Sequence, residues 1–241
     1  MRPVQATRVL VVIPTYNEAE NILPLTREIL AADPSFEVLV VDDASPDGTG
    51  QRVAAAAEGE PRLLLLARTG KLGLGSAYVA GFRYGLAHGH DWILTMDGDG
   101  SHPPHHLPAL LDAARACDCV VGSRYVPGGE IRNWPPHRRA LSAFANFYTR
   151  TLLGLSVRDC TSGYRAYARR VLEAVDLSNV RSSGYSFLEE MLYRAHRAGF
   201  RIVEVPISFQ DRTAGASKIS QREIYRAAWH VLVTAWRARR R

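Results

Sequence analysis

The first half of the chain alternates apolar runs with segments of helical character, and this alternation constrains the fold more than any other feature. Four apolar runs are each followed by an amphipathic, alanine-rich or glycine-containing segment; they cover residues 8–13, 37–41, 62–66 and 92–96. Short apolar runs of this kind are typical of buried strands. Consecutive β-α units build parallel sheets with helices on both faces. We therefore predict an α/β fold with a mainly parallel sheet flanked by helices.

Length, charge and cysteine content narrow the possibilities. A chain of 241 residues suits one large α/β domain. Lys and Arg number 30 against 24 Asp and Glu, a formal charge of +6, which predicts an anionic partner. No nucleic-acid motif is present, so phosphorylated small molecules or a lipid surface are favoured. The sequence has no signal-peptide pattern, and its three cysteines are expected to be free thiols in a reducing cytoplasm; they are Cys117, Cys119 and Cys160.

The fourth apolar run stops at two carboxylates, Asp97 and Asp99, separated by Gly98. Residues two apart in an extended chain project to the same side, so both carboxylates can bind one hard cation. Mg²⁺ is usually held by one or two protein carboxylates, with substrate phosphates and water completing its shell. The motif therefore predicts a divalent metal that holds a diphosphate. The alternative is a polar turn that ends a strand before Pro103 and Pro104 begin a helix.

A second acidic pair follows the second run, and the first run ends near further polar residues. The carboxyl ends of parallel strands meet at one edge of a sheet, where open α/β sheets bind ligands. We expect Tyr16, Glu18 and Asp43 to join Asp97 and Asp99 in a shared cleft there. Asp43 would accept hydrogen bonds from a base or ribose. The glycine loop at residues 70–75 lacks a P-loop ending and is interpreted as a tight turn.

Basic residues of the second half are candidate phosphate ligands. Two prolines followed by Arg138 and Arg139 predict the start of a long helix, where free N–H groups and the helix dipole favour anions. The alternative, that these arginines are solvated, is adopted for Arg139. Arg212 and Lys218 lie in a glycine-containing loop, residues 211–220, that could cover phosphates as a lid. Residues 159–163 are predicted to form a polar turn that could simply connect two neighbouring segments.

The predicted helix at residues 185–197 carries Glu189 and Glu190, which face different directions. One of them could act as a general base toward a hydroxyl acceptor. Both could equally be ordinary surface charges, which is the commoner case.

The tail is predicted to form a basic amphipathic helix, residues 221–241, after a domain of residues 1–220. A capping box runs from Ser220 to Glu223. Basic residues near an anionic bilayer each contribute on the order of 1 kcal/mol, so the helix could contact a membrane surface. A helix that packs on the core and has a solvated end is the alternative. One apolar face is expected to contain Ile224, Ala228, Val231, Leu232 and Ala235.

These segments together resemble the dolichol-phosphate mannose synthases, also called polyprenol monophosphomannose synthases, which are inverting glycosyltransferases of the GT-A (Rossmann-like) fold. The resemblance extends from Val12 to about Ser220. It rests on I-P-T-Y-N-E, V-D-D-A-S-P-D-G-T, K-L-G-L-G, M-D-G-D-G-S-H-P-P, G-S-R-Y, T-S-G-Y-R, V-P-I-S-F-Q-D-R and G-A-S-K.

The resemblance implies transfer of mannose from GDP-mannose to a dolichyl or polyprenyl phosphate with inversion, aided by Mg²⁺ or Mn²⁺. The implied donor-binding residues are Pro14, Tyr16, Glu18, Val41, Asp43, Asp97, Gly98, Asp99, Arg124, Arg212 and Lys218. The implied catalytic residues are Asp99, Arg124, Arg212 and Lys218. The implied acceptor-phosphate ligands are Arg124, Arg138 and Ser142. The implied metal ligands are Asp97 and Asp99, with Ser101 at a position where some relatives have a metal-binding glutamine.

Further expectations follow from the resemblance. Gly98 stands where alanine is usual in relatives. Many relatives continue into a membrane-spanning domain or recruit a membrane partner. We expect this chain to be cytoplasmic and peripheral at the inner face of a membrane, where a separate anchoring protein is one possible partner.

The chemistry needs no catalytic base. A lipid phosphate monoester, with a second pKa near 6, is largely ionised at neutral pH and can attack the anomeric carbon unaided. Three alternatives remain: a UDP-glucose-dependent polyprenyl-phosphate glucosyltransferase, a transferase to a hydroxyl acceptor with Glu189 or Glu190 as base, and a non-catalytic nucleotide-sugar binding module. The intact D-G-D motif and the Arg-Lys loop argue against the last.

Overall fold

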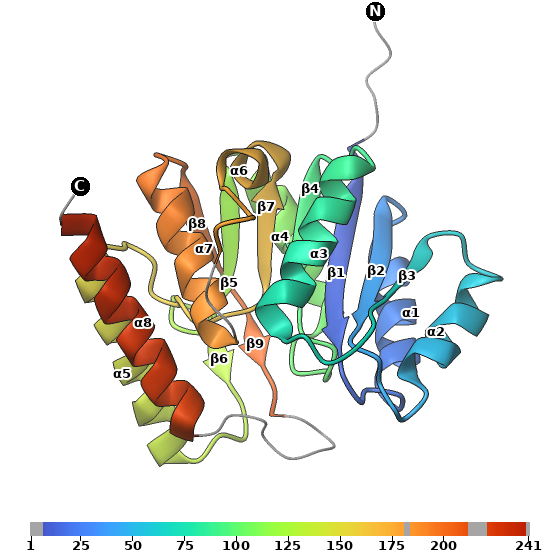
Figure 1. Cartoon of the computed structure of the whole chain (residues 1–241), viewed down its shortest axis with the longest axis horizontal. Helices are drawn as coiled ribbons and strands as arrows, with labels where there is room; N and C mark the ends of the chain where they lie inside the picture. The colour runs from blue at the N-terminus through green and yellow to red at the C-terminus, as the bar shows by residue number, and fades with distance from the viewer. Residues whose placement is uncertain (1–6, 181–183, 212–220, 240–241) are drawn as a thin grey trace, which may run out of the picture.

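The computed structural model describes residues 7–180, 184–211 and 221–239, and Figure 1 shows how their helices and strands are arranged. Within those ranges, one large sheet is accompanied by a short two-stranded one. The large sheet contains β1 (Val9–Thr15), β2 (Phe36–Asp42), β3 (Leu63–Ala67), β4 (Trp92–Thr95), β5 (Cys119–Ser123), β7 (Arg165–Ala168) and β8 (Ile202–Pro206). The short pair is β6 (Glu130–Ile131) with β9 (Ser208–Phe209).

The large sheet is mainly parallel, which confirms the predicted α/β class. Its strand order is β3-β2-β1-β4-β7-β5-β8. The exception is β7, which runs antiparallel to both β4 and β5. The parallel strands therefore end at the lower edge of the sheet in Figure 1, whereas β7 begins there. In the described part of the chain β8 pairs with β5 alone, so the edge position predicted from Pro206 is confirmed.

Helices cover both faces of the sheet. Alternate residues of each strand point to opposite faces, so Val9, Val11 and Ile13 pack with α1, α2 and α4, whereas Leu10 and Val12 pack with α3, α6 and α7. The helices are α1 (Ile22–Ala32), α2 (Thr49–Ala57), α3 (Leu74–Ala87), α4 (Leu107–Ala114), α6 (Arg169–Ala174) and α7 (Tyr185–Arg197), with a short 3₁₀ helix, Pro104–His106, before α4.

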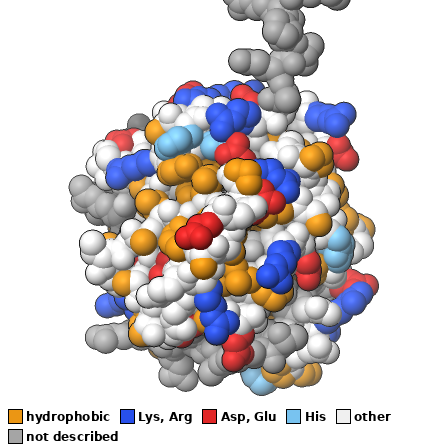
Figure 2. All heavy atoms as spheres, turned by 90° about the vertical axis from the view of Figure 1, so that its right-hand side faces the viewer, with side chains coloured by type: hydrophobic (Ala, Val, Ile, Leu, Met, Phe, Trp, Pro, Cys, Tyr) orange, Lys and Arg blue, Asp and Glu red, His pale blue; other side chains and the backbone are white. Residues whose placement is uncertain are grey.

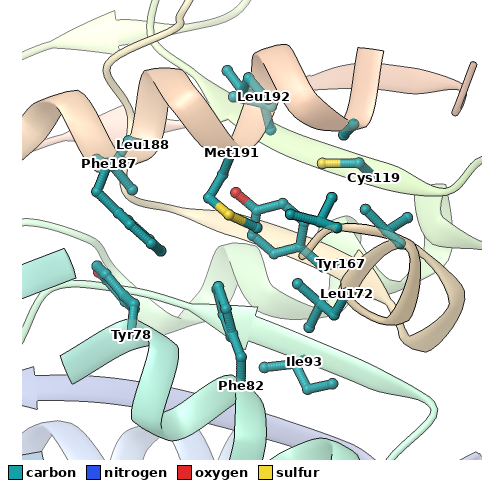
Figure 3. Packing of buried hydrophobic residues seen from close by; sticks show 14 of the residues in the cluster. Tyr78, Phe82, Ile93, Cys119, Tyr167, Leu172, Phe187, Leu188, Met191 and Leu192 are labelled. Atoms are coloured by element: carbon teal, nitrogen blue, oxygen red, sulfur yellow. The ribbon is translucent and has the colours of Figure 1, made fainter. Parts of the chain in front are cut away.

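Aromatic side chains fix α3 and α7 against the sheet (Figure 3). Tyr78 stacks on Phe187 at a centroid distance of 5.7 Å, and Phe82 meets Tyr167 edge to face at 5.5 Å. Helix α3 also lies unusually close to β1, because a Cβ atom on Gly81 would come within 2.3 Å of Val12 Cγ1. This packing places the start of both helices firmly at the ligand-binding edge.

Two long helices, α5 (Pro136–Leu153) and α8 (Gln221–Arg239), lie side by side beyond β8 (Figure 1). In α8, Val231 and Ala235 are buried and belong to the main core. Leu232 was predicted to share that apolar face, which is wrong, because it is 43% exposed. The helix therefore packs on the core, as one of the two alternatives held, and it also has an exposed apolar side; contact of this helix with a membrane stays a prediction. None of the described helices has the length and apolar character needed to span a bilayer.

Candidate active site

The loops that follow β1 and β2 hold each other in place. The backbone N–H groups of residues 17–19 donate to side-chain oxygens within residues 45–49, each at 3.0 Å. Asp42 lies beneath them and accepts hydrogen bonds from Thr15 Oγ1 at 2.9 Å and from the Ser45 N–H at 3.0 Å. The T-Y-N-E and D-D-A-S-P-D-G-T segments thus form one interlocked structure at the sheet edge.

Asp43 organises the glycine loop rather than lining the main cavity. Its Oδ1 pairs with Arg68 Nη1 at 2.8 Å, and its Oδ2 accepts the N–H groups of Leu72 and Gly73 at 3.0 and 2.9 Å. The carboxylate is 5% exposed. These contacts direct Asp43 toward the loop after β3, and Asp43 is not among the residues that line the main cavity, so the expected cleft shared with Asp97 and Asp99 stays a prediction.

The other residues expected to contact the nucleoside lie beside Asp43. Tyr16 is half-buried, and Lys71 Nζ lies 4.0 Å from the centroid of its ring. Glu18 accepts a hydrogen bond from Asn21 Nδ2 at 2.9 Å. Pro14 is near the end of β1, whereas the side chain of Val41 is fully buried in the core. A nucleoside contact by Val41 would consequently involve its backbone only.

A cavity of about 320 Å³ lies between the sheet edge and helices α5, α7 and α8. Its volume is in the range of small-molecule sites. One wall is polar and contains most of the remaining predicted site residues, namely Asp97, Asp99, Ser101, Arg124, Arg138 and Ser142. The other wall is apolar and is formed by Leu141, Phe144, Ala145, Tyr148, Ala227, Ala228 and Val231. The structure thus brings together residues from seven separate segments of the chain.

Asp97 and Asp99 contribute carboxylates to the polar wall. The side chain of Asp97 is 31% exposed, and its N–H donates to His102 Nδ1 at 3.2 Å. Burial lowers the pKa of His102, so the ring is neutral and can accept that hydrogen bond. Asp99 is nearly buried, and its Oδ1 accepts from the Ser101 N–H at 3.0 Å and from Ser101 Oγ at 2.6 Å. Ser101 therefore orients Asp99.

The donor set at this wall fits a hard divalent ion, because carboxylate oxygens are the ligands that Mg²⁺ and Mn²⁺ prefer. Among the described residues, no group of three or more His, Cys, Asp or Glu side chains could hold a metal. An ion bound by Asp97 and Asp99 would thus need oxygens from a substrate or water. Gly98 keeps the pair close to β1, since a Cβ atom there would lie 3.3 Å from both Ile13 Cγ2 and Thr15 Cγ2.

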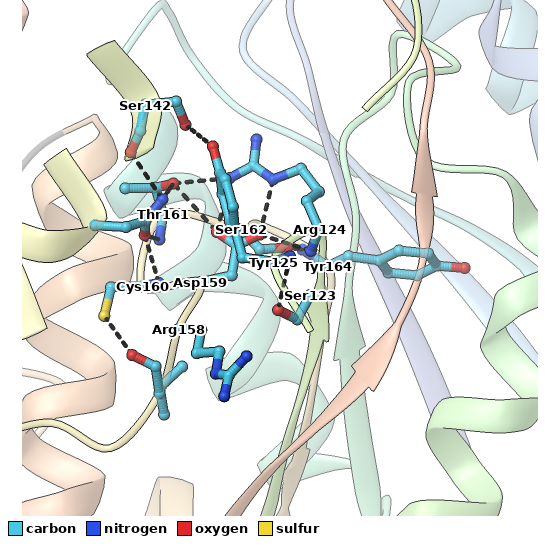
Figure 4. Close-up of polar contacts among 12 residues, drawn as sticks. Ser123, Arg124, Tyr125, Ser142, Arg158, Asp159, Cys160, Thr161, Ser162 and Tyr164 are labelled. Carbon is cyan, nitrogen blue, oxygen red and sulfur yellow. Dashed lines mark hydrogen bonds and ion pairs between the residues drawn. The ribbon is translucent and has the colours of Figure 1, made fainter. Parts of the chain in front are cut away.

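Arg124 enters the cavity wall as half of a buried ion pair (Figure 4). Its Nε and Nη2 each donate to Asp159 at 2.7 Å, its backbone N–H donates to Asp159 at 3.0 Å, and Nη2 also reaches Thr161 Oγ1 at 2.8 Å. Burial opposes ionisation of both groups, but their mutual attraction outweighs it, so the pKa of Arg124 is raised and that of Asp159 is lowered.

Asp159 therefore compensates the charge of Arg124. The role of Arg124 as a phosphate ligand stays a prediction, and Nη1 is the guanidinium nitrogen that lies outside the pair with Asp159. Residues 159–163 are therefore more than the connecting turn considered from sequence, since they contain the partner of Arg124. No pattern in the sequence around Asp159 identifies Arg124 as its partner, because the two residues are 35 positions apart.

Arg138 and Ser142 lie in the first turns of α5, as predicted. Arg138 Nη1 pairs with Asp211 at 2.9 Å, and its guanidinium lies 4.0 Å from the Trp134 ring centroid. Tyr125 donates its hydroxyl to Ser142 Oγ at 2.8 Å. Sequence reasoning missed Trp134, although its place directly before the two prolines was visible. Arg139 is exposed, in agreement with the solvated interpretation, whereas Arg212 and Lys218 lie outside the described residues.

Glu189 and Glu190 are both buried, so the surface interpretation of these residues is wrong. Glu189 lines the cavity and accepts a hydrogen bond from Thr149 Oγ1 at 3.0 Å. Burial raises its pKa to about 7. Glu190 instead pairs with Arg194 at 2.5 Å and with His230 of α8 at 3.3 Å. Glu190 thus connects α7 to α8, and only Glu189 of the two faces the cavity.

Comparison with known proteins places the chain among transferases. The family described as Glycosyl transferase family 2 matches residues 10–176. The undecaprenyl-phosphate mannosyltransferase of Micrococcus luteus is 51% identical over 230 residues, which cover 95% of this chain and 93% of that protein. The polyprenol monophosphomannose synthase of Mycolicibacterium smegmatis is 50% identical over 233 residues, which cover 96% of this chain and 87% of that protein.

Solved structures with the same fold are more distant in sequence. The glucosyl-3-phosphoglycerate synthase of Mycobacterium tuberculosis, in complex with Mn²⁺, UDP and phosphoglyceric acid, gives a TM-score of 0.69 at 19% identity, covering 97% of this chain and 78% of that one. A mannosyltransferase of Pyrobaculum calidifontis, in complex with GDP-Man and Mn²⁺, gives 0.61 at 21% identity, covering 99% and 66%. At such identities the likeness concerns the fold alone.

Proposed function

Because the chain belongs to glycosyl transferase family 2, we propose that it transfers mannose from GDP-mannose to a polyprenyl phosphate. The structural likenesses confirm the expected GT-A fold. The relatives at about half identity carry the names of the family that the sequence resembles, and those names supply the sugar and the lipid acceptor.

The observation that carries the proposal is the two-sided cavity. Metal-binding and phosphate-binding side chains, Asp97, Asp99, Arg124 and Arg138, line the same cavity as apolar side chains of α5 and α8. A phosphorylated lipid needs both surfaces at once, because its head group is anionic and its chain is hydrocarbon. A transferase acting on a water-soluble acceptor has no use for the apolar wall.

On the donor side, Asp97 and Asp99 would hold Mg²⁺ or Mn²⁺ against the diphosphate. A bound ion supplies compensation for the negative charge that develops on the departing GDP. Tyr16 and Lys71 would contact the nucleoside, and Asp43 would contribute by fixing the loop that contains Lys71. Arg212 and Lys218 are proposed as further phosphate ligands from their place in the sequence.

On the acceptor side, Arg138 and Ser142 would bind the lipid phosphate at the start of α5, where the helix dipole also favours an anion. Arg124 would donate from Nη1 to the same group. Asp211 accepts from Arg138 Nη1, so Nε and Nη2 of Arg138 would be the donors to the phosphate. The bound phosphate oxygen then attacks the anomeric carbon in line with the leaving diphosphate, which inverts the configuration from α to β.

We further propose that the protein docks on a membrane through α5 and α8. These helices carry a patch of large exposed hydrophobic side chains that is unusual for a protein surface in water. Figure 2 shows a different face, over β3 and α2, on which acidic and basic side chains are spread among hydrophobic ones. The exposed patch consists of Leu141, Phe144 and Phe147 of α5 with Tyr225, Trp229, Leu232 and Trp236 of α8.

The apolar wall of the cavity and this patch belong to the same two helices. A lipid could thus pass from the bilayer into the cavity without its chain crossing water. Arg139, Arg150 and Arg226 are described cationic side chains close in sequence to the patch, and they suit an anionic lipid surface. Peripheral binding at the inner face of a membrane, with or without an anchoring partner, follows from this proposal.

The test is to incubate the purified chain with a panel of nucleotide sugars, a polyprenyl phosphate and Mg²⁺ or Mn²⁺, and to identify the lipid product by mass. We expect a hexose-phosphate lipid from GDP-mannose and little from UDP-glucose. A product from UDP-glucose alone would replace the proposed donor. Metal-dependent donor binding without any lipid product would indicate a binding module instead.

A further inference from the structure

We propose that Glu189, together with Thr149, binds a hydroxyl group of the sugar while it is transferred. The inference rests on the proposed function and extends it, because it assigns the group that would distinguish one hexose from another. Nothing in the reaction as derived above uses Glu189, since an ionised lipid phosphate needs no base.

The position of Glu189 supports this role. It lies one turn into α7, is 4% exposed and lines the cavity that contains Asp97 and Arg124. Its Oε1 accepts from Thr149 Oγ1, whereas its Oε2 is buried without a hydrogen-bond partner in the part of the chain that the structure describes. A buried acceptor without a partner is costly, and its presence in a cavity indicates that a ligand supplies the missing donor.

The chemistry of the surroundings selects the ligand. Thr149 is two helical turns, about 10 Å, beyond Ser142 on α5. A phosphate bound at Ser142 therefore leaves room for one sugar ring before Glu189. The lipid chain has no group to donate to a carboxyl, and a phosphate would be repelled by its ionised form. A sugar hydroxyl can donate to a carboxylate and can also accept from a carboxylic acid.

This versatility matters because burial raises the pKa of Glu189 to about 7, so both forms exist near neutral pH. Glu190 provides the contrast. It is the adjacent acid on the same helix, but it pairs with Arg194 and His230 and does not line the cavity. A sugar-binding role consequently falls on one of the two neighbours only.

The test compares the affinity for GDP-mannose with the affinity for GDP, which lacks the sugar, in the presence of Mg²⁺. We expect Glu189→Leu to weaken GDP-mannose binding and raise its KM by about 10-fold or more, which corresponds to loss of one buried hydrogen bond. Binding of GDP should stay within about 2-fold, by the same additivity that keeps separate contacts independent. Thr149→Val should change the ratio of GDP-mannose affinity to GDP affinity by a smaller factor than Glu189→Leu does. Glu190→Gln should leave that ratio unchanged.

Two further measurements keep the proposal open to refutation. Thermal unfolding shows whether each variant is folded. If Glu189→Leu is not folded, the ratio of GDP-mannose affinity to GDP affinity is measured with Glu189→Gln instead. The inference is overturned if the wild type transfers mannose while the Glu189 variants retain the wild-type ratio of GDP-mannose to GDP affinity. Failure of the proposed function is a separate outcome, in which the wild type itself transfers no mannose.

Discussion

At the end of β2 the chain contains Asp42 and Asp43, and at the end of β4 it contains Asp97 and Asp99. Both pairs follow a buried apolar strand at the same edge of one sheet, yet their surroundings differ. The β2 pair is buried and engaged by hydroxyls, backbone N–H groups and Arg68. The β4 pair lines a cavity.

This difference shows that an acid at a strand end has two distinct uses. At β2 the carboxylates are acceptors that order the loops around the nucleoside region. At β4 they remain directed toward a space where a ligand can complete their environment. Loss of a β2 acid should therefore reduce stability more than chemistry, and loss of a β4 acid should do the opposite.

The largest expected effect concerns the β4 pair. We expect Asp97→Ala and Asp99→Ala to lower the transfer rate at least about 1,000-fold, about 4 kcal/mol in the activation free energy, because the metal and diphosphate lose their ligand. The melting temperature should change little. Asp112→Asn, at an exposed acid of α4, is the control. Near-normal turnover by both alanine variants would refute the metal assignment.

Substitution of Asp159 tests whether one acid can both stabilise the fold and serve the ligand-binding cavity. It is fully buried like the β2 acids, but its partner Arg124 lines the cavity. Asp159→Asn should lower the free energy of unfolding by about 3–5 kcal/mol, because it leaves a buried guanidinium uncompensated. Urea unfolding measures this loss. The KM for the lipid phosphate should rise while GDP affinity is retained, and an equal loss of both would contradict a positioning role.

A substitution in the β2 pair should give a smaller effect, and it should reduce stability rather than the transfer rate. Asp42→Ala removes acceptors for Thr15 and Ser45, and we expect it to lower the free energy of unfolding by about 2–4 kcal/mol. Activity per folded molecule should remain within an order of magnitude of the wild type. If Asp42→Ala were as stable as the wild type but inactive, the distinction between the two acidic ends would fail.

Glu189 also lines the cavity, and its burial makes the ionised form of its side chain unfavourable in the folded protein. Its pKa rises from 4.5 to about 7, so the folded state holds a proton that the unfolded state has lost between these pH values. Stability should then fall as pH rises from about 5 to 7, by up to about 3 kcal/mol. Glu189→Gln should lack this contribution. Melting curves of both proteins from pH 5 to 8 measure the difference, and parallel curves would argue against it.

The smallest effect belongs to the helices that close the β4 cavity. Trp229 is 68% exposed and Trp236 is 54% exposed. Each Trp→Ala change should weaken binding to anionic vesicles by about 1–2 kcal/mol, or roughly 10-fold, through loss of buried apolar surface. Sedimentation with vesicles measures the binding. Transfer to a short-chain, water-soluble acceptor should be unaffected, since neither side chain lines the cavity.

Much of the fold could be predicted from the sequence because its signals are local. The periodicity of four successive β-α units is contained in short windows, and the apolar runs of β1, β2 and β4 leave few alternatives. The direction of β7 could not be predicted, because residues 165–168 are too few to carry a periodicity and nothing nearby identifies their strand partners.

The candidate site was predicted in part, for similar reasons. Asp97, Asp99, Arg138 and Ser142 lie in motifs whose local geometry is informative, and the structure places all four on one cavity wall. The partnership of Arg124 with Asp159, the turn of Asp43 toward its own loop and the burial of Glu189 depend on contacts between distant segments. Such contacts are set by tertiary packing and leave no trace in a single sequence.

The reversed direction of β7 also bears on how specificity can change in this architecture. Because β7 starts where its neighbours end, the turn before it, residues 161–163, forms part of the cavity floor. The connection from α5 to this turn packs on the sheet, because Leu155, Val157 and Cys160 are buried in the same core cluster as Cys119 and Val121 of β5. Side-chain changes within residues 161–163 would therefore reshape the cavity while leaving every ladder of the sheet in register, whereas insertions or deletions between residues 154 and 160 would disturb the core and the Asp159 partner of Arg124.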